Sequence, residues 1–462
     1  MPHWLSRHRW LWVVAVLLVA LLAFAACEDE EEEGGGTPAA GGPLKIGLLV
    51  DFTGALSDFG PEQENAAKLA ITHINDAGGV LGEPVELVVG DSGTTPDIGV
   101  SEARRLVDVE GVHAIVGSLA SGVTLAVAES VTIPSNILQI SPASTSPALT
   151  DVADDDLLFR TPISDAAQGL VLGKLVEDLG FTKVCTMYVN NAYGQGLSEN
   201  FTDAFTGEVT AQISHTAETA TTYLSELNSC VEGGPEALVA ISYPTGQADV
   251  YLREALENDL VSTFVFVDGT KSNDMFDRLG WENFDGMAGT SPGALPPSDF
   301  TDAFDTLYQT EYGEMFQQPF VHEAYDAVIA IALAAEKAGS TDPSDIRDAL
   351  RDVSNAPGAV VDSPPEGIAA ALEAVGNGED IDYSGASGSV EFDENGDVLL
   401  GTIDTWHVDA AAKQLVTDKS YKVDLEAGTV EEIVGAWGPD FRGSVDRVFR
   451  LDPVLERAIR PL

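Results

Sequence analysis

From residue 44 onward, short apolar runs alternate with longer segments in which apolar residues recur every three or four positions. The first pattern predicts buried strands and the second predicts amphipathic helices. The predicted strands cover residues 44–52, 85–91, 112–119, 137–141, 183–189, 210–214, 237–243 and 263–269. The predicted helices cover residues 61–79, 101–110, 123–131, 166–180, 247–259, 299–313, 320–339 and 343–353. This alternation is typical of mostly parallel sheets covered by helices, so we predict an α/β fold.

Two breaks divide the alternation of predicted strands and helices. The first is at residues 160–169, and the second, at residues 289–299, is interpreted as a connection between elements. The units are too numerous for one small sheet, and they lack the eightfold regularity of a barrel. We therefore predict two doubly wound, Rossmann-like lobes joined by a multi-strand hinge. Lobe I is assigned residues 44–163 plus 292–394, and lobe II is assigned residues 164–291 plus 395–462, which include a C-terminal extension.

A β-hairpin is predicted at residues 389–408, because Asn395 and Gly396 suit a tight turn between two strand-like runs. Residues 410–462 are polar and mixed, and they show no usable pattern.

The N-terminus predicts export. Arg7 and Arg9 precede an apolar run that ends at Cys27, which indicates a secretory signal over residues 1–26. Residues 27–43 are acidic and Gly-rich, as in a flexible tether. This order resembles a bacterial lipoprotein, with Phe24 where that family usually has Leu. The resemblance implies a lipid on Cys27 and an extracytoplasmic protein tethered to the membrane. An uncleaved membrane anchor is the alternative.

Charge narrows the classes of partner. The chain of 462 residues carries 75 acidic against 23 basic residues, a formal net charge of -52. Such a charge disfavours phosphate backbones and anionic lipid surfaces, so we predict no nucleic-acid binding. It suits a protein that stays soluble in concentrated salt, which predicts a halophilic source; an acidic protein from an ordinary source is the alternative.

Two cysteines remain besides Cys27. Because an even pair in an exported protein is commonly bridged, Cys185 and Cys230 are predicted to form a disulfide. Two separately buried thiols are the alternative.

Catalytic motifs are absent or fail on mechanism. Residues 289–293 match GxSxG, but Pro292 cannot supply the N–H that an oxyanion hole needs there, so we interpret this segment as a linker. The histidines lack zinc-ligand spacing, residues 393–397 lack the spacing of a calcium loop, and no phosphate-binding glycine motif occurs. We predict a protein that is not an enzyme and needs no metal or cofactor.

Polar groups follow the predicted strands of the first lobe. Ser121 opens a helix directly after a strand, where free N–H groups favour an anion. Ala143, Ser144 and Thr145 lie at the next strand end, in the stretch ISPASTSPALT. Ligands of open α/β sheets bind beyond these ends, so we predict a carboxylate site there. Helix capping is the alternative role for Ser121 and Thr145.

The second lobe offers the opposite chemistry. Tyr193, Tyr243 and Asp268 each stand at the end of a predicted strand, and Phe59 lies in the opening loop of the first lobe. An acidic side chain near aromatic faces favours an ammonium group. Together the lobes predict a site for a zwitterion. Packing is the alternative role for Tyr193, and a turn position is the alternative for Asp268.

Residues 44–408 resemble type I periplasmic substrate-binding proteins of the branched-chain amino-acid (LIV) class. The stretches that carry the resemblance are DFTGALSDFGPEQENAAKLAITHINDAGGVLG, VGSLASGVT, ISPASTSPALT, LLFRTPISDAAQG, NNAYGQGLSENF and VDGTKSN. It implies that Ser121 and Thr145 bind the α-carboxylate with main-chain help from Ala120 and Ala143. It also implies that Asp268 binds the α-ammonium with the Ala143 carbonyl and the Thr145 hydroxyl, and that the pocket is lined by Phe59, Leu119, Tyr193 and Tyr243. Phe59 stands where amino-acid binders often have Tyr, and Asp268 is shorter than the Glu of some members.

The expected function is capture of a small, branched-chain-like amino acid by closure of the two lobes, for an ABC importer whose permease is a separate chain. We expect a monomer. One alternative is a sensory receptor of the same fold that binds an amide, urea or an aromatic acid. The other is an exported hydrolase, which lacks a recognisable nucleophile and base.

Overall fold

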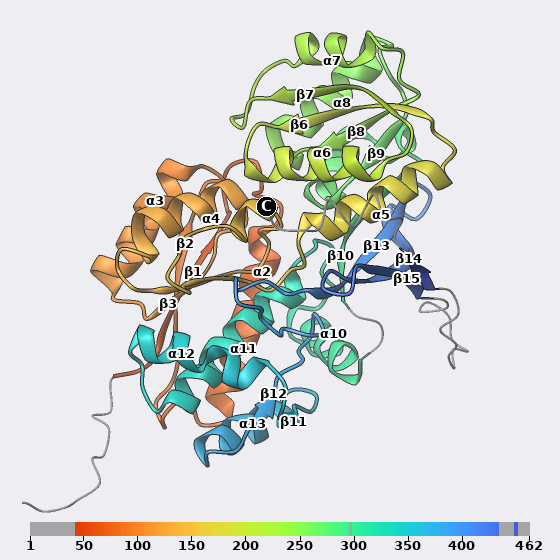
Figure 1. The fold of residues 1–462 in the computed structure, drawn as a ribbon. Coiled ribbons are helices and arrows are strands. Elements are labelled where there is room, and N and C mark those ends of the chain that lie inside the picture. Colours follow the sequence, from red (N-terminus) through yellow and green to blue (C-terminus); the bar gives the residue numbers. More distant parts are fainter. Residues whose placement is uncertain (1–41, 295–297, 434–447, 451–462) are drawn as a thin grey trace, which may run out of the picture. The chain divides into compact units, whose positions relative to one another are not determined.

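A computed structural model describes residues 42–294, 298–433 and 448–450. Its first sheet has five parallel strands in the order β2-β1-β3-β4-β5 (Figure 1). The bounds are β1 Lys45–Val50, β2 Glu86–Asp91, β3 Ala114–Gly117, β4 Leu138–Ser141 and β5 Leu158–Arg160. The strands β3, β4 and β5 are buried throughout, and only β3 is apolar along its whole length; β4 and β5 include buried Gln139, Ser141 and Arg160.

The helices of this lobe come from two distant parts of the chain. They are α2 Gly60–Asp76, α3 Pro96–Arg104, α4 Ser121–Val127, α10 Asp299–Tyr312, α11 Val321–Ala338, α12 Pro343–Ser354 and α13 Glu366–Gly376. Helix α11 packs against α2, α12 and α13, and it is buried along most of its length. Its apolar residues surround the helix on every side, as a helix at the centre of a lobe requires.

The second sheet has nine strands in the order β16-β15-β14-β13-β10-β9-β8-β6-β7. The strands β6 to β10 are parallel, and β13 to β16 extend the sheet in antiparallel fashion. The strand bounds are β6 Lys183–Val189, β7 Glu208–His215, β8 Ala237–Ile241, β9 Phe264–Phe266, β10 Ala288–Gly293, β13 Leu400–Asp409, β14 Gln414–Asp424, β15 Thr429–Ile433 and β16 Val448–Arg450. The associated helices are α5 Asp165–Asp178, α6 Ala192–Ala204, α7 Leu224–Val231, α8 Asp249–Glu257 and α9 Asn273–Leu279. A separate pair of short strands consists of β11 Ala359–Val360 and β12 Ile381–Asp382. Two wound sheets confirm the predicted fold class.

The prediction of a linker at residues 289–299 was wrong for its first half, which forms β10. Glycine and proline hid the strand. Strand β10 pairs along its length with β13, but it pairs with β9 at Gly289 alone. On the β9 side, the missing N–H of Pro292 therefore interrupts no ladder.

The predicted hairpin at residues 389–408 was wrong in its extent, although the predicted tight turn at Asn395 and Gly396 is present. Its first half forms only an isolated bridge between Phe392 and Val398, and the hairpin of this region joins β13 to β14. The Asp393 carboxylate accepts hydrogen bonds from the backbone N–H groups of Asn395 and Asp397, which closes a tight turn. The carbonyl of Gly396 accepts from the backbone of Arg160, so this turn is tied to the end of β5 instead of to β13.

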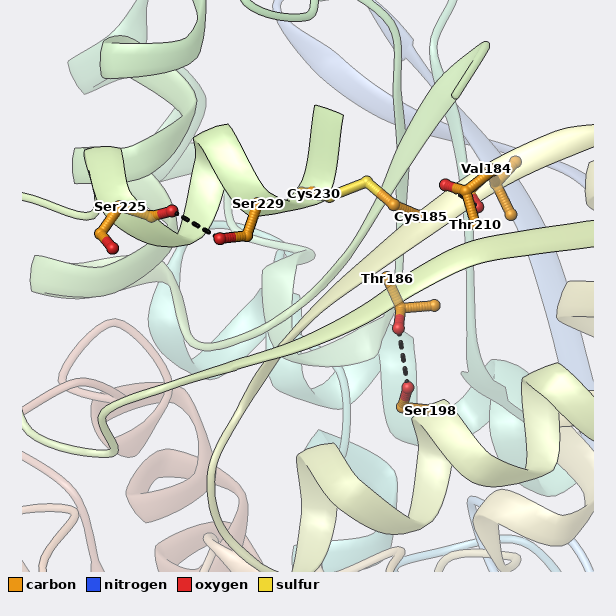
Figure 2. The surroundings of a disulfide bond; sticks show 8 residues. All are labelled: Val184, Cys185, Thr186, Ser198, Thr210, Ser225, Ser229 and Cys230. Atoms are coloured by element: carbon orange, nitrogen blue, oxygen red, sulfur yellow. Dashed lines mark hydrogen bonds between the residues drawn. A yellow bond between two sulfur atoms is a disulfide. The ribbon is translucent and has the colours of Figure 1, made fainter. Parts of the chain in front are cut away.

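A disulfide joins Cys185 on β6 to Cys230 on α7, with Cα atoms 5.7 Å apart (Figure 2). Both residues are completely buried in the core of the second lobe. The bridge encloses a sequence separation of 45 residues, which includes β7. Closing a loop of this length restricts the unfolded chain and is worth about 2–4 kcal/mol in typical cases.

We therefore expect reduction of this bridge to destabilise the protein. Thermal unfolding with and without a reductant should show a lower Tm in the reduced sample, by several degrees for a loss of about 2–4 kcal/mol. The double variant Cys185→Ala, Cys230→Ala is the control, because its Tm should not respond to reductant. An unchanged Tm in a sample whose thiols are shown to be free would contradict this role.

Candidate functional site

A cavity of about 290 Å³ lies between residues of the two lobes. We call it the inter-lobe cavity. Its lining residues are Leu56, Phe59, Leu119, Ser121, Ala143 and Phe320 from the first lobe and Tyr193, Tyr243, Asp268 and Gly269 from the second. Seven of the ten residues predicted to bind a ligand are in this lining; Ala120, Ser144 and Thr145 are not.

On the first lobe, the hydroxyl groups divide into two kinds. The Ser121 Oγ, at the start of α4, accepts a hydrogen bond from the backbone N–H of Ser146 at 3.3 Å, and its proton stays available to a ligand. The Thr145 Oγ1 is buried without a hydrogen-bond partner in the described residues. Ser144 instead lies 2.8 Å from the Thr124 hydroxyl and 3.2 Å from the Leu119 carbonyl. Ser144 therefore stabilises the loop.

The loop that carries Thr145 is held by a buried cation. The Arg160 guanidinium is 1% exposed and donates to the carbonyls of Thr145 at 3.0 Å and Ser146 at 2.8 Å. Arg160 also lies 2.7 Å from Asp397, so the same side chain ties the 393–397 turn to this loop. Ala120 supplies the carbonyl that begins α4.

On the second lobe, Asp268 is the polar centre. Its Oδ1 accepts from the Tyr193 hydroxyl at 2.7 Å and from Gln168 Nε2 at 2.9 Å, and the residue is 3% exposed. Burial raises the pKa of Asp268. Gly269 donates its N–H to the Tyr193 oxygen at 3.2 Å. A Cβ atom at Gly269 would lie 2.8 Å from that oxygen, so only glycine permits this approach.

A second carboxylate lies behind the first. Asp165 begins α5, is completely buried, and neither of its side-chain oxygens has a hydrogen-bond partner in the described residues. Burial and the charge of Asp268 raise the pKa of Asp165 well above its usual range. The Thr145 hydroxyl and the charge of Arg160 lower the pKa of Asp165 only in part, so two buried carboxylates remain costly here, and a positive charge brought to Asp268 would stabilise both.

Aromatic rings close the remaining walls. The rings of Tyr193 and Tyr243 stack with centroids 5.5 Å apart and an interplanar angle of 9°. Burial raises the pKa of both phenols, so they are neutral donors at ordinary pH. Phe59 and Phe320 are 2% and 5% exposed. Phe320 has φ +70°, a conformation that is strained for a bulky residue.

Sequence reasoning missed several participants: Leu56, Asp165, Gln168, Gly269 and Phe320. The Phe320 segment was recognised only as the start of a helix. Asp165 lies in the stretch LLFRTPISDAAQG, where Ser164 and Asp165 read as the cap and first turn of α5. Nothing in the pattern showed that the Asp165 side chain faces another acid.

Asp58 connects the two lobes beside the inter-lobe cavity. Its carboxylate accepts from the hydroxyls of Ser272 at 2.7 Å and Thr245 at 3.2 Å, and it pairs with the Arg278 guanidinium at 3.1 Å. Asp58 belongs to the loop after β1, whereas its three partners come from the second lobe. This set of contacts is available only when the lobes are together.

Metal binding and membrane spanning are two alternative roles. In the described residues, no group of three or more His, Cys, Asp or Glu side chains could hold a metal ion. Within the same part of the chain, no helix has the length and apolar content needed to cross a membrane. The predicted signal segment 1–26 and Cys27 lie outside the described residues.

Comparison with known families and structures gives a consistent result. A family model described as "Periplasmic binding protein" matches residues 43–380. The Leu/Ile/Val-binding protein homolog 1 of Brucella abortus is 28% identical over 318 residues, which are 66% of this chain and 82% of that protein. The chemotactic signal transduction system substrate-binding protein BasB of Halobacterium salinarum is 26% identical over 360 residues, or 76% of this chain and 84% of that protein.

Solved structures share the fold. The branched-chain amino acid transporter substrate binding protein LivJ of Streptococcus pneumoniae, crystallised with isoleucine, has a TM-score of 0.67 and 23% sequence identity. The alignment covers 83% of this chain and 99% of that one. This likeness confirms the architecture of a type I periplasmic binding protein with two lobes.

Proposed function

This chain belongs to the periplasmic binding protein family, and from that premise we propose that it captures a small amino acid, preferably a branched-chain one, for an ABC importer. The family consists of binding proteins and not of enzymes. The observation that carries the proposal is the polarity of the inter-lobe cavity, which has the Ser121 hydroxyl on one lobe and the Asp268 carboxylate on the other. A zwitterion placed between them would satisfy both sides.

The ligand would be oriented by its two charges. Its α-carboxylate would accept hydrogen bonds from the hydroxyl groups of Ser121 and Thr145. Neither hydroxyl donates to another group among the described residues. Its α-ammonium would lie against Asp268, within the field of Asp165. Each ion loses several kcal/mol on leaving water, so one lobe alone binds it poorly, and closure supplies all partners together.

The preference for an apolar side chain follows from the walls. The side chains of Leu56, Phe59, Leu119 and Phe320 offer only carbon to the cavity, which suits an apolar group. The Brucella abortus relative is named as a Leu/Ile/Val-binding protein homolog, and the solved LivJ structure contains isoleucine. Asp268 disfavours uncharged amides and urea, which could not neutralise it.

We place the protein outside the cytoplasm, anchored through a lipid on Cys27, and assign its acidic surface to solubility in salt. A monomer that presents its closed form to a separate permease fits this arrangement. A sensory role is the second candidate, because a relative of 26% identity has a printed role in chemotactic signal transduction. Neighbouring genes for permeases favour the importer, and neighbouring genes for a transducer or kinase favour the sensor.

Thermal-shift screening of the purified protein at high salt tests the ligand class. Leucine, isoleucine or valine should raise the Tm. At a ligand concentration 100 times Kd, binding raises the free energy of unfolding by about 2.7 kcal/mol. Amides, urea and benzoate form the comparison set. If only an uncharged amide or urea stabilises the protein, the amino-acid proposal is wrong.

Closure itself can be tested at Asp58, which is not one of the residues that line the inter-lobe cavity. We expect Asp58→Ala to weaken the affinity for the amino acid by about 5- to 20-fold, because loss of the contacts to Ser272, Thr245 and Arg278 shifts the population toward the open form. Isothermal titration calorimetry measures the change. The exposed Asp203, changed to Asn, is the matched control. An unchanged affinity in Asp58→Ala would show that these contacts do not bias closure.

A further inference from the structure

A second cavity of about 1040 Å³ lies beside the inter-lobe cavity, with Phe320 in the lining of both. We call it the polar cavity. It is bounded by the turn after Asp268, the end of β10, helix α10, the start of α11 and the β13–β14 hairpin. Its lining residues are Lys271, Pro292, Gly293, Ala294, Thr301, Asp302, Asp305, Met315, Phe316, Gln318, Pro319, Phe320, His322, Glu323, Asp404 and Thr417.

The polar cavity has more negative than positive charge. Asp302, Asp305, Glu323 and Asp404 contribute four carboxylates, and only Lys271 and His322 can oppose them. His322 lies 2.8 Å from the Asp305 carboxylate, so that pair is already matched. The excess of negative charge therefore lies around Glu323 and Asp404.

Lys271 opposes this charge only in part, because its positive charge acts to lower the pKa of both Asp404 and Glu323 without forming a direct ion pair to either. Its Nζ donates to the Ser291 hydroxyl at 3.0 Å, and among the described residues it forms no ion pair. Asp404 is 7% exposed and accepts from the Ser420 hydroxyl at 2.6 Å. Burial raises the pKa of Asp404 to about 6, although the charges of Lys271 and His322 act to lower it.

Two buried acceptors in the lining lack donors. Glu323 is 4% exposed, and no other residue in the described part of the chain donates a hydrogen bond to its carboxylate. Burial raises the pKa of Glu323 to about 7. Gln318 is 5% exposed, and its Oε1 is buried with no partner. Buried acceptors are normally paired, so Gln318 Oε1 indicates a donor that comes from a ligand, and Glu323 adds a carboxylate to the same lining.

We propose that the polar cavity is a second binding site, which takes an organic cation that carries several N–H donors, such as a guanidinium or primary ammonium group. Glu323, Asp404 and Gln318 Oε1 supply the acceptors for such a group, and Phe316 and Phe320 are aromatic members of the same lining. An inorganic ion fits less well, because no cluster of three metal-ligating side chains exists in the described residues. This site is distinct from the proposed amino-acid site, since it does not include Asp268 or Ser121.

Agmatine is a suitable probe, and choline, a cation without N–H groups, is its matched comparison. Calorimetry on the purified wild-type protein should show binding of agmatine and at least tenfold weaker binding of choline. Glu323→Gln should weaken agmatine binding at least tenfold, whereas Gln318→Glu, which adds a carboxylate at the unpaired acceptor, should strengthen it. Asp268→Asn should change it less than twofold.

The outcomes separate this proposal from the amino-acid function. Loss of agmatine binding in Asp268→Asn would mean that the probe enters the inter-lobe cavity, and the polar cavity would be no site. Equal affinities of wild type and Glu323→Gln, or no agmatine binding at millimolar concentration, would overturn the proposal as well. Leucine binding in Glu323→Gln reports independently on the amino-acid site, which should remain intact.

Discussion

Asp268→Asn should reduce the affinity for a branched-chain amino acid by about 2–5 kcal/mol, which is roughly 30-fold to more than 1000-fold. The Asp268 carboxylate is the only charged group in the lining of the inter-lobe cavity, and Tyr193 and Gln168 hold its Oδ1 in place. Asparagine keeps the shape and can still accept from both partners. The loss therefore measures the charge that the ligand's ammonium would meet. Calorimetry at constant salt gives the value.

The matched control is Asp203→Asn, which removes one negative charge from an exposed position on α6 of the same lobe. Its affinity should equal that of the wild type, which separates the local effect from the change in net charge. Circular dichroism and Tm show whether the variants are folded. Wild-type affinity in Asp268→Asn would mean that the ligand's charge is met elsewhere, and a ligand with an ammonium group would lose its main support.

The sequence predicted the fold class well because its apolar runs and helical periods are long and buried. The prediction failed where a strand contains glycine and proline and has few apolar residues. Strand β10 has this composition, and it is stable because β13 supplies its ladder from a part of the chain more than 100 residues away. A local pattern contains no information on such a partner. Strands β14 and β15 were missed in the same way, since their sequences are polar and half-exposed.

The sequence predicted where the candidate site lies, but it did not predict the role of each side chain in it. The hydroxyl-rich stretch after β4 indicated a site, yet only the structure shows which hydroxyl groups are already used. Ser141 donates to the Ser118 carbonyl at 2.6 Å, and Ser146 donates to the Ala192 carbonyl at 2.8 Å, so both stabilise the loop. Thr145 is left without a partner. Such assignments depend on distances between distant segments.

Asp165 was missed for a related reason: a carboxylate in the first turn of a helix usually reflects the helix dipole alone. The Asp165 oxygens have no hydrogen-bond partner among the described residues, and the charge of Asp268 raises the pKa of Asp165. We infer that Asp165 has a second role, in ligand recognition. We interpret it as a residue that is costly in the empty protein and useful in the occupied one. Stability and ligand affinity should therefore respond to Asp165 in opposite directions.

Asp165→Asn is expected to raise the free energy of unfolding of the empty protein near pH 7 by about 1–3 kcal/mol, since it removes an unpaired buried acid. Burial raises the pKa of Asp165 in the folded state, so its favourable contribution is complete below the unfolded-state pKa. That contribution is lost as the pH rises through the folded-state pKa. The advantage of the variant should thus grow with pH and become small near pH 3. Urea unfolding at several pH values measures it, with Asp203→Asn as the control.

The same variant should bind the amino acid about tenfold more weakly, a cost of about 1.4 kcal/mol, because the ammonium loses half of the negative field that attracts it. Binding to the wild type should release protons, since an incoming cation lowers the raised pKa values of Asp165 and Asp268. Calorimetry in two buffers of different ionisation enthalpy detects this release, and Asp165→Asn should reduce it. A variant that is destabilised at pH 7, or that binds with wild-type affinity and wild-type proton release, would show that Asp165 is neutral in both states and takes no part in recognition.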